Sequence, residues 1–269
     1  MGDFDTSHDY QLAGTILFPM AVTGFTCNFI VIIFLNSMPS LNNSFGSLTL
    51  SQALVDCAHQ LMLAFYLAPT IYYKNKAMYA LSDQFGFAIL LAYQLCCFSH
   101  VCISINRFTA VYVPLAYSEI FRRIYIYICH YCYCWAIYLT LIIRREFLVD
   151  CTFYVPYGTW IFTFKETPSC YRVKWYGDFT LNSLSVVIVA ILDISAILKL
   201  HCMSVNHTDS VSRQRRSSQI NLAYQAAFQG IFFITELITY FLLSSYSRDK
   251  WEAYALTTIS WCLVNGMDG

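Results

Sequence analysis

Four carboxylates interrupt long apolar runs of this sequence, where a charged group is costly. They are Asp56, Asp193, Glu236 and Asp268, and no Lys or Arg lies in the same runs. If the runs are buried in lipid, each charge costs roughly 2.5 to 3.5 kcal/mol even on the most lenient insertion scale. We therefore expect these acids to be neutral, hydrated or ion-bound, and we expect no basic side chain to pair with them.

Two of these acids leave alternatives open. Asp193 lies near one end of its apolar run, so it either belongs to an intramembrane polar relay with Asp56 and Asp268 or simply reaches water. Glu236 either lines a ligand cavity or is a neutral, hydrogen-bonded acid, and the sequence favours neither. A functional relay is the default hypothesis for ionisable groups inside a membrane.

The twelve cysteines do not indicate a disulfide framework, because ten of them lie in or beside apolar runs. Only Cys151 and Cys170 lie in a polar connecting segment. Two thiols that face the same oxidising compartment usually close, and for a loop of about 20 residues the chain-entropy estimate is roughly 3 kcal/mol. We predict a disulfide between Cys151 and Cys170, with two free loop thiols as the alternative.

Cys129, Cys132 and Cys134, with His130, resemble a metal-binding cluster only superficially. A helix would point these cysteines in different directions, and the segment is apolar. The sequence also lacks a Gly-rich phosphate loop, a His-Glu-x-x-His pattern and a nucleophile elbow. We therefore predict no metal site, no cofactor and no enzymatic activity.

A basic segment, Arg213–Arg216, precedes Ser218. Such a cluster is typical of a stop-transfer signal beside a membrane span. It also places Ser218 behind two arginines, as basic-directed kinases prefer, so Ser218 is a candidate phosphorylation site.

The elements that must position these residues are long apolar helices. Apolar residues make up 58% of the chain and charged residues 12%, about half the charged share usual for a soluble domain. A helix needs roughly 20 apolar residues to cross a bilayer core. Seven runs meet this requirement: 12–35, 45–73, 84–105, 124–143, 179–198, 222–246 and 251–269. We predict a single all-α membrane domain, 1–269, built as a bundle of seven transmembrane helices with a shortened seventh helix.

The longest connection, 144–178, is rich in aromatic residues. Long loops without regular structure are more often functional lids than spacers. We predict that this loop covers a cavity at the outer end of the bundle, lined by Trp160 and Glu236. Such a cavity would suit a small amphipathic or cationic molecule.

The charges of the chain exclude one class of partner and suggest an orientation. The formal net charge is zero, which gives no electrostatic basis for binding nucleic acid. The first ten residues contain acids but no Lys or Arg, which favours an N-terminus outside the cell. The expected surrounding is the lipid bilayer of the plasma membrane, in which a sensory cilium is one compatible location.

Several motifs together resemble the nematode serpentine chemoreceptors of class x, a divergent branch of the rhodopsin-like receptors. The matching stretches follow the family's order along nearly the whole chain: 44–54, 105–108 followed by Pro114, 119–121, 151–170, 191–194, 257–261 and 268–269. The resemblance implies a seven-helix receptor for an unknown small-molecule or peptide cue. It also implies coupling to a heterotrimeric G protein on the cytosolic face.

The resemblance assigns roles to individual polar residues. Asn28 and Asp56 stand where rhodopsin-like receptors keep an Asn and an Asp, so Asn28 joins the expected relay. Asn106, Arg107 and Phe108 stand in place of the usual acidic-Arg-aromatic triplet, which implies that Arg107 faces the G protein. The plainer alternative is an interfacial arginine that extends to lipid headgroups.

Asn106 departs from the pattern of the wider superfamily, because a neutral amide cannot hold Arg107 in an ion pair. We therefore expect the resting-state lock to be weaker or different. Unless another group replaces the missing acid, basal activity should be measurable without ligand.

Two other functions stay open at this point. A small transporter or channel is one, although transporters usually show repeated halves with matching broken helices. Pro19 and Pro69 are the only prolines within the predicted spans, and no repeat answers them. A truncated, inactive receptor relative is the other, because the seventh run ends at Gly269.

Overall fold

The computed structural model describes residues 7–38, 43–117, 119–121, 151–203, 224 and 228–268. Within this part of the chain, five helices are long and apolar enough to cross a membrane: Ser7–Ser37, Ser44–Tyr73, Ser82–Tyr112, Pro168–Cys202 and Phe228–Tyr246. Several predicted features lie outside the described residues, namely the fourth span 124–143, Cys129, His130, Cys132, Cys134 and Ser218.

The first half of the chain forms α1 (Ser7–Ser37), α2 (Ser44–Met62), η2 (Leu63–Leu67), α3 (Ala68–Tyr73), α4 (Lys76–Ala80) and α5 (Ser82–Tyr112). The π-helical turn η2 joins α2 and α3 into one continuous helix. The second half forms β1 (Phe153–Tyr154), β2 (Thr163–Phe164), α7 (Pro168–Arg172), η4 (Val173–Phe179), α8 (Thr180–Met203), η5 (Ile238–Leu243), η6 (Ser244–Tyr246), α10 (Lys250–Tyr254), η7 (Ala255–Ile259) and α11 (Ser260–Gly266). The turns η5 and η6 end the Phe228–Tyr246 helix, and η7 joins α10 to α11.

Local sequence determines where several of these helices begin and end. The side chains of Asn43, Asn75 and Asp249 each accept a backbone N–H of the following helix, at 3.0, 2.9 and 2.8 Å. These bonds satisfy amide groups that have no partner within the first helical turn. Lys74 ends α3 in the left-handed conformation, with φ of 49°.

The outer face of α8 shows why these helices need lipid. Exposed apolar side chains recur at every third or fourth residue of α8: Val187, Ile191, Ile194 and Leu198. Residues at this spacing share one face of a helix, whereas the polar residues Asn182 and Asp193 on the opposite face are buried. An apolar stripe of this length is stable only against lipid or a partner surface.

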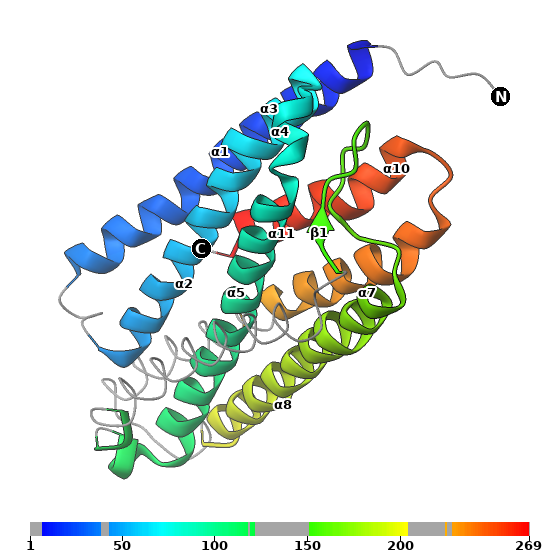
Figure 1. Ribbon diagram of the computed structural model, residues 1–269. Helices are drawn as coiled ribbons and strands as arrows, with labels where there is room; N and C mark the ends of the chain where they lie inside the picture. Colours follow the sequence, from blue (N-terminus) through cyan, green and yellow to red (C-terminus); the bar gives the residue numbers. More distant parts are fainter. Residues whose placement is uncertain are drawn as a thin grey trace.

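Helix α5 lies at the centre of the described bundle, between α2 and α8 (Figure 1). On the other side of α2, α1 packs against α2, α3 and α11. Strand β1 lies against the N-terminal half of α5 at Gly86, whereas Arg107 lies near the C-terminal end of the same helix. Helix α5 therefore connects the two ends of the bundle.

The loop that contains β1 and β2 folds into the bundle at the end where α10 begins (Figure 1). The two strands pair antiparallel, with Phe153 opposite Phe164. A disulfide joins Cys151 to Cys170 and closes the base of this hairpin. Most of its apolar side chains are buried: Phe153, Val155, Trp160, Phe162 and Phe164.

Hydroxyl groups from the helices fasten the tip of this loop. Tyr10, Tyr79 and Thr258 donate to the carbonyl groups of residues 158, 159 and 160, at 2.8, 3.1 and 2.9 Å. The donors belong to α1, α4 and η7, so the loop ties together segments far apart in sequence.

Replacing Gly86 with Ala is expected to displace this loop. A Cβ at this position would lie 1.8 Å from the carbonyl oxygen of Phe153, so the backbone of α5 or β1 would have to move. We expect most of the correctly folded protein to be lost from the cell surface, as measured by staining an N-terminal tag. Gly230→Ala is the control, because no atom lies within 4 Å of a Cβ there. Equal surface levels for the two variants would contradict the packing.

Opening the disulfide is expected to lower stability. Cys151→Ser with Cys170→Ser removes a constraint that the chain-entropy model values at roughly 3 kcal/mol. Thermal unfolding of the purified protein should show a lower midpoint. Cys202→Ser is the control, since Cys202 is a free, exposed cysteine. Identical midpoints for the double variant and the control would show that the disulfide does not stabilise the loop.

Candidate functional site

Arg107 forms an ion pair with Asp193 on the neighbouring helix α8. The Nη1 atom of Arg107 lies 3.7 Å from Oδ2 of Asp193, and the two side chains are 15% and 2% exposed. Ser104, which precedes Arg107 by three residues on α5, donates from Oγ to the same oxygen at 3.2 Å. The expectation that no basic side chain pairs with the intramembrane acids is therefore wrong for Asp193.

Asp193 also does not reach water, which was the simpler alternative for this residue. Its predicted position near a span end was correct, but α8 turns the side chain towards α5 and buries it. Such burial is tolerable because Arg107 supplies an opposite charge and Ser104 a hydrogen bond.

Asn106 faces a different partner from Arg107. Its Oδ1 accepts a hydrogen bond from the hydroxyl of Tyr117 at 3.2 Å, and that hydroxyl lies 3.3 Å from Oγ of Ser44. Asn106 therefore connects α5 to the start of α2 through the helical segment 114–117. The Arg107 guanidinium lies 5.5 Å from the centre of the Phe45 ring.

Phe108 is half-buried and packs against another aromatic ring of α5. Its ring stacks on that of Tyr112, one turn further along α5, with centroids 4.2 Å apart. Of the three predicted coupling residues, Arg107 alone takes part in the charged contact with α8.

The relay residues lie in three separate places in the structure. Asn28 is fully buried and donates from Nδ2 to the carbonyl of Asn265 at 3.1 Å, which joins α1 to α11. Asp56 and Asp268 lie near each other and near Cys96. Asp193 belongs to the Arg107 site instead.

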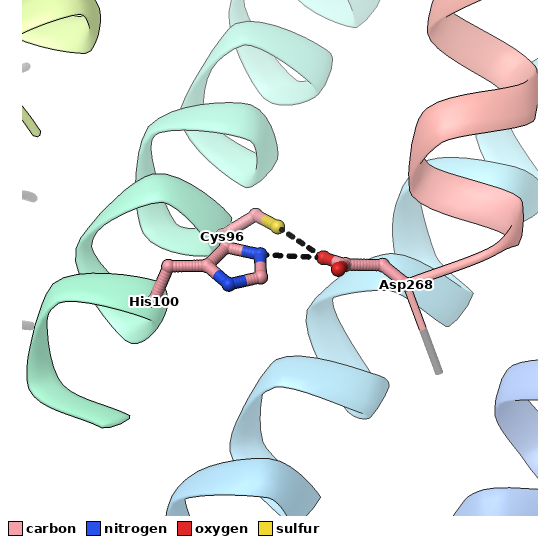
Figure 2. Close-up of side chains that lie close together, drawn as sticks. All are labelled: Cys96, His100 and Asp268. Carbon is pink, nitrogen blue, oxygen red and sulfur yellow. Dashed lines mark hydrogen bonds and ion pairs between the residues drawn. The ribbon is translucent and has the colours of Figure 1, made fainter. Parts of the chain in front are cut away.

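Asp268 is held by side chains from α2 and α5, and Figure 2 shows the two from α5. Its Oδ2 accepts hydrogen bonds from Gln52 of α2 at 2.6 Å and from His100 of α5 at 2.7 Å. The thiol of Cys96 also points at this oxygen, at 3.3 Å. The carbonyl of Asp268 accepts a further bond from Gln229 of the Phe228–Tyr246 helix at 2.6 Å.

Asp56 is the least satisfied acid of the described residues. Its side chain is 0% exposed, and neither carboxylate oxygen has a hydrogen-bond partner among these residues. Both ring nitrogens of His59, on the same helix, are also buried without such a partner. Buried polar atoms usually have a partner, so Asp56 and His59 are unusual among the described residues.

Glu236 lines a narrow cavity beneath the aromatic loop. The hydroxyl of Tyr93 donates to its Oε2 at 2.6 Å. A second acid, Asp178, lines the same cavity and accepts hydrogen bonds from Gln94 at 3.0 Å and Asn182 at 2.6 Å. The remaining lining is mostly aromatic: Leu90, Phe153, Tyr240, Phe241 and Trp261.

Trp160 is not among the described residues that line this cavity. Its ring packs edge-on against Tyr10, Trp251 and Tyr254, with centroid distances of 5.6, 4.7 and 5.7 Å. Trp160 thus anchors the loop to α1 and α10. Trp261, and not Trp160, lines the cavity together with Glu236.

The sequence interpretation missed Tyr93, Asp178 and Trp261. Tyr93 and Gln94 carry hydrogen-bonding groups in an otherwise apolar run. This contrast could have identified them as candidate cavity residues. Asp178 was taken as the end of the outer loop, although it lies in a helix that continues without a break into α8.

Known proteins resemble this chain over nearly its whole length. A sequence model of the family described as serpentine type 7TM GPCR chemoreceptor Srx matches residues 18–269. Serpentine receptor class X 45 of Caenorhabditis elegans is 26% identical over 296 residues, which cover 100% of this chain and 80% of that protein. Serpentine receptor class X-43 of the same nematode is 23% identical over 280 residues, with 98% and 84% covered.

The fold is also that of a solved structure. The crystal structure of squid rhodopsin matches with a TM-score of 0.76 at 15% sequence identity, over 99% of this chain and 81% of the rhodopsin chain. At this identity, the match establishes the architecture of the helical bundle and not a shared ligand.

Proposed function

The chain belongs to the family of serpentine seven-transmembrane G-protein-coupled chemoreceptors called Srx, and we propose that it senses a small cationic molecule near Glu236 and signals through Arg107. It is an integral, multi-pass membrane protein with a seven-transmembrane-helix fold, and its family and fold are those of receptors and not of enzymes. These matches give no support to the alternative of a transporter or channel.

The Arg107–Asp193 ion pair is the single observation that best supports the signalling half of the proposal. It joins α5 to α8 at the end of the bundle opposite the aromatic loop. Because the partners belong to different helices, a relative movement of α5 and α8 breaks the pair and frees Arg107. Asp193 would then replace the acidic neighbour that Asn106 cannot provide, and the freed Arg107 would contact a heterotrimeric G protein.

The cavity beneath the loop supports the ligand class. Two acids, Glu236 and Asp178, face a lining of aromatic rings. Carboxylates attract cations, and a cation over an aromatic face gains a further 0.5 to 2 kcal/mol, roughly, depending on desolvation. A small amine with an apolar body fits both features. It would reach the cavity by displacing the loop that β1 and β2 form.

Removing one carboxylate is expected to weaken the response to amines selectively. A panel of primary to quaternary amines, with neutral analogues of the same shape, would be screened in cells with a G-protein reporter. We expect Glu236→Gln to lower the potency of active amines at least tenfold. Glu252→Gln, which changes an exposed acid at the start of α10, is the control. Equal responses of both variants to every active amine would rule out Glu236 as the ligand counter-ion.

The proposal also includes the plasma membrane, with the N-terminus outside and Arg107 towards the cytosol. The apolar face of α8 supports a location in a membrane, and the acidic N-terminal residues support the orientation. An epitope tag at the N-terminus should therefore be accessible to antibody in intact cells.

A further inference from the structure

Three side chains able to bind a metal ion meet between α5 and the end of α11 (Figure 2). Cys96 and His100 lie one helical turn apart on α5, and both point towards Asp268. One potential ligand atom of each lies within 4.8 Å of the others. Ligands four residues apart on a helix share one face, so α5 presents a preformed pair.

We propose that Cys96, His100 and Asp268 bind a divalent transition-metal ion of the Zn²⁺ type, with Asp56 as the fourth ligand. Zn²⁺ takes thiolate, imidazole and carboxylate ligands in tetrahedral geometry. A thiolate together with an imidazole favours such an ion over Mg²⁺ or Ca²⁺, which prefer all-oxygen sites. The proposed site is additional to the proposed ligand cavity and to the Arg107 site.

Asp56 provides independent support for an ion at this place. Its carboxylate is fully buried near Asp268 and Cys96, and no described residue donates a hydrogen bond of ordinary geometry to either of its oxygens. Two carboxylates this close repel each other, and no Lys or Arg lies in the apolar runs that hold them. A divalent cation would offset that repulsion and complete the coordination of both oxygens.

Among Cys96, His100 and Asp268 the distances require only small movements of side chains, whereas Asp56 lies outside this group and would have to turn towards it. The His100–Asp268 contact of 2.7 Å is shorter than the separation of two ligands around zinc, which is roughly 3 to 4 Å for bonds of about 2.0 to 2.3 Å. The Cys96–Asp268 contact of 3.3 Å already falls in this range. Binding would replace these hydrogen bonds with metal–ligand bonds, and the thiol proton of Cys96 would pass to water.

Neighbouring groups supply a second shell and an access route. Gln52 donates to Asp268 at 2.6 Å and would keep that carboxylate oriented. His100 also lines a small cavity of about 20 Å³ between α5 and α8, which Arg107 and Asp193 line as well. An ion could therefore enter from the end of the bundle at which Arg107 lies. Once bound, it would join α2, α5 and the segment after α11.

Cobalt substitution tests the proposal directly. The full-length protein would be purified in lipid nanodiscs, stripped with a chelator and titrated with Co²⁺, whose tetrahedral complexes with thiolates give a charge-transfer band. We expect a saturable band in the wild type that one equivalent of Zn²⁺ abolishes. The band should disappear in Cys96→Ser and require at least tenfold more Co²⁺ in His100→Ala.

Matched variants separate metal binding from folding. Cys97→Ser changes the adjacent buried cysteine, which is not part of the cluster, and should keep the band. Zn²⁺ should raise the unfolding temperature of the wild type and of Cys97→Ser but not of His100→Ala. A wild type without the band, or a band that persists unchanged in Cys96→Ser, would overturn the proposal. These readouts do not depend on ligand or G protein.

Discussion

Replacing Asp193 with Asn is expected to raise signalling in the absence of ligand about tenfold. The substitution keeps the size of the side chain and its bond from Ser104 but removes the charge that attracts Arg107. The contact of 3.7 Å is longer than a hydrogen bond, so we expect it to contribute less than the roughly 1.5 to 3 kcal/mol of a hydrogen bond to a charged group. About 1.4 kcal/mol changes a population ratio tenfold. A G-protein reporter in cells, normalised to surface level, measures the change.

Ser195→Ala is the matched control for this variant. Ser195 is also on α8, but its hydroxyl bonds within its own helix and not to α5. Basal output from Asp193→Asn no higher than that of the control, at equal surface level, would mean that the ion pair does not restrain the resting receptor.

Arg107→Ala is expected to abolish signalling by the receptor molecules that reach the cell surface. The variant removes the side chain proposed to contact the G protein, so neither basal nor amine-stimulated output should remain. It also leaves the Asp193 charge buried without its partner, a change that can cost about 3 to 5 kcal/mol of stability. The double variant Arg107→Ala with Asp193→Asn avoids this cost. It should therefore recover surface level without recovering output.

The single and double variants distinguish two explanations for a silent receptor. If the double variant signals as strongly as Asp193→Asn alone, then Arg107 is only a structural partner of Asp193. If both variants are silent and the double variant is well expressed, then Arg107 acts in coupling.

The position of Arg107 could be predicted from sequence, but its partner could not. A short motif and the end of an apolar run marked Arg107. Asp193 follows it by 86 residues, and only the packing of α8 against α5 brings the two side chains together. The periodicity of an almost wholly apolar helix does not indicate which face meets which neighbour, because nearly every face is apolar.

The sequence also could not show which side chains surround the acids near Cys96. Asp56 and Asp268 were recognised as costly inside a membrane, and both are buried. His100 was not singled out from the sequence. Its contact with Asp268 is 2.7 Å long, which is shorter than the 3.3 Å contact of Cys96 with the same residue (Figure 2). Its sequence separation from Asp268 is 168 residues, so no local pattern links the two.

For the loop between Cys151 and Cys170, the sequence predicted a contact between distant residues correctly. Cys151 and Cys170 were identified because they alone among the cysteines lie in a polar segment, and they are bonded in the structure. The aromatic composition of the loop was informative about burial but not about which ring points where. Trp160 packs against α1 and α10, because the disulfide and the bond from Thr258 hold the loop in that register.

The most direct test of the proposed mechanism is guanine-nucleotide exchange by a purified heterotrimeric G protein, measured with the receptor in nanodiscs. Three forms would be compared at equal concentration: wild type, Asp193→Asn, and Asp193→Asn with Arg107→Ala. We predict that Asp193→Asn accelerates exchange about tenfold over the wild type and that the added Arg107→Ala returns it to the rate without receptor. Equal acceleration with and without Arg107 would contradict the account.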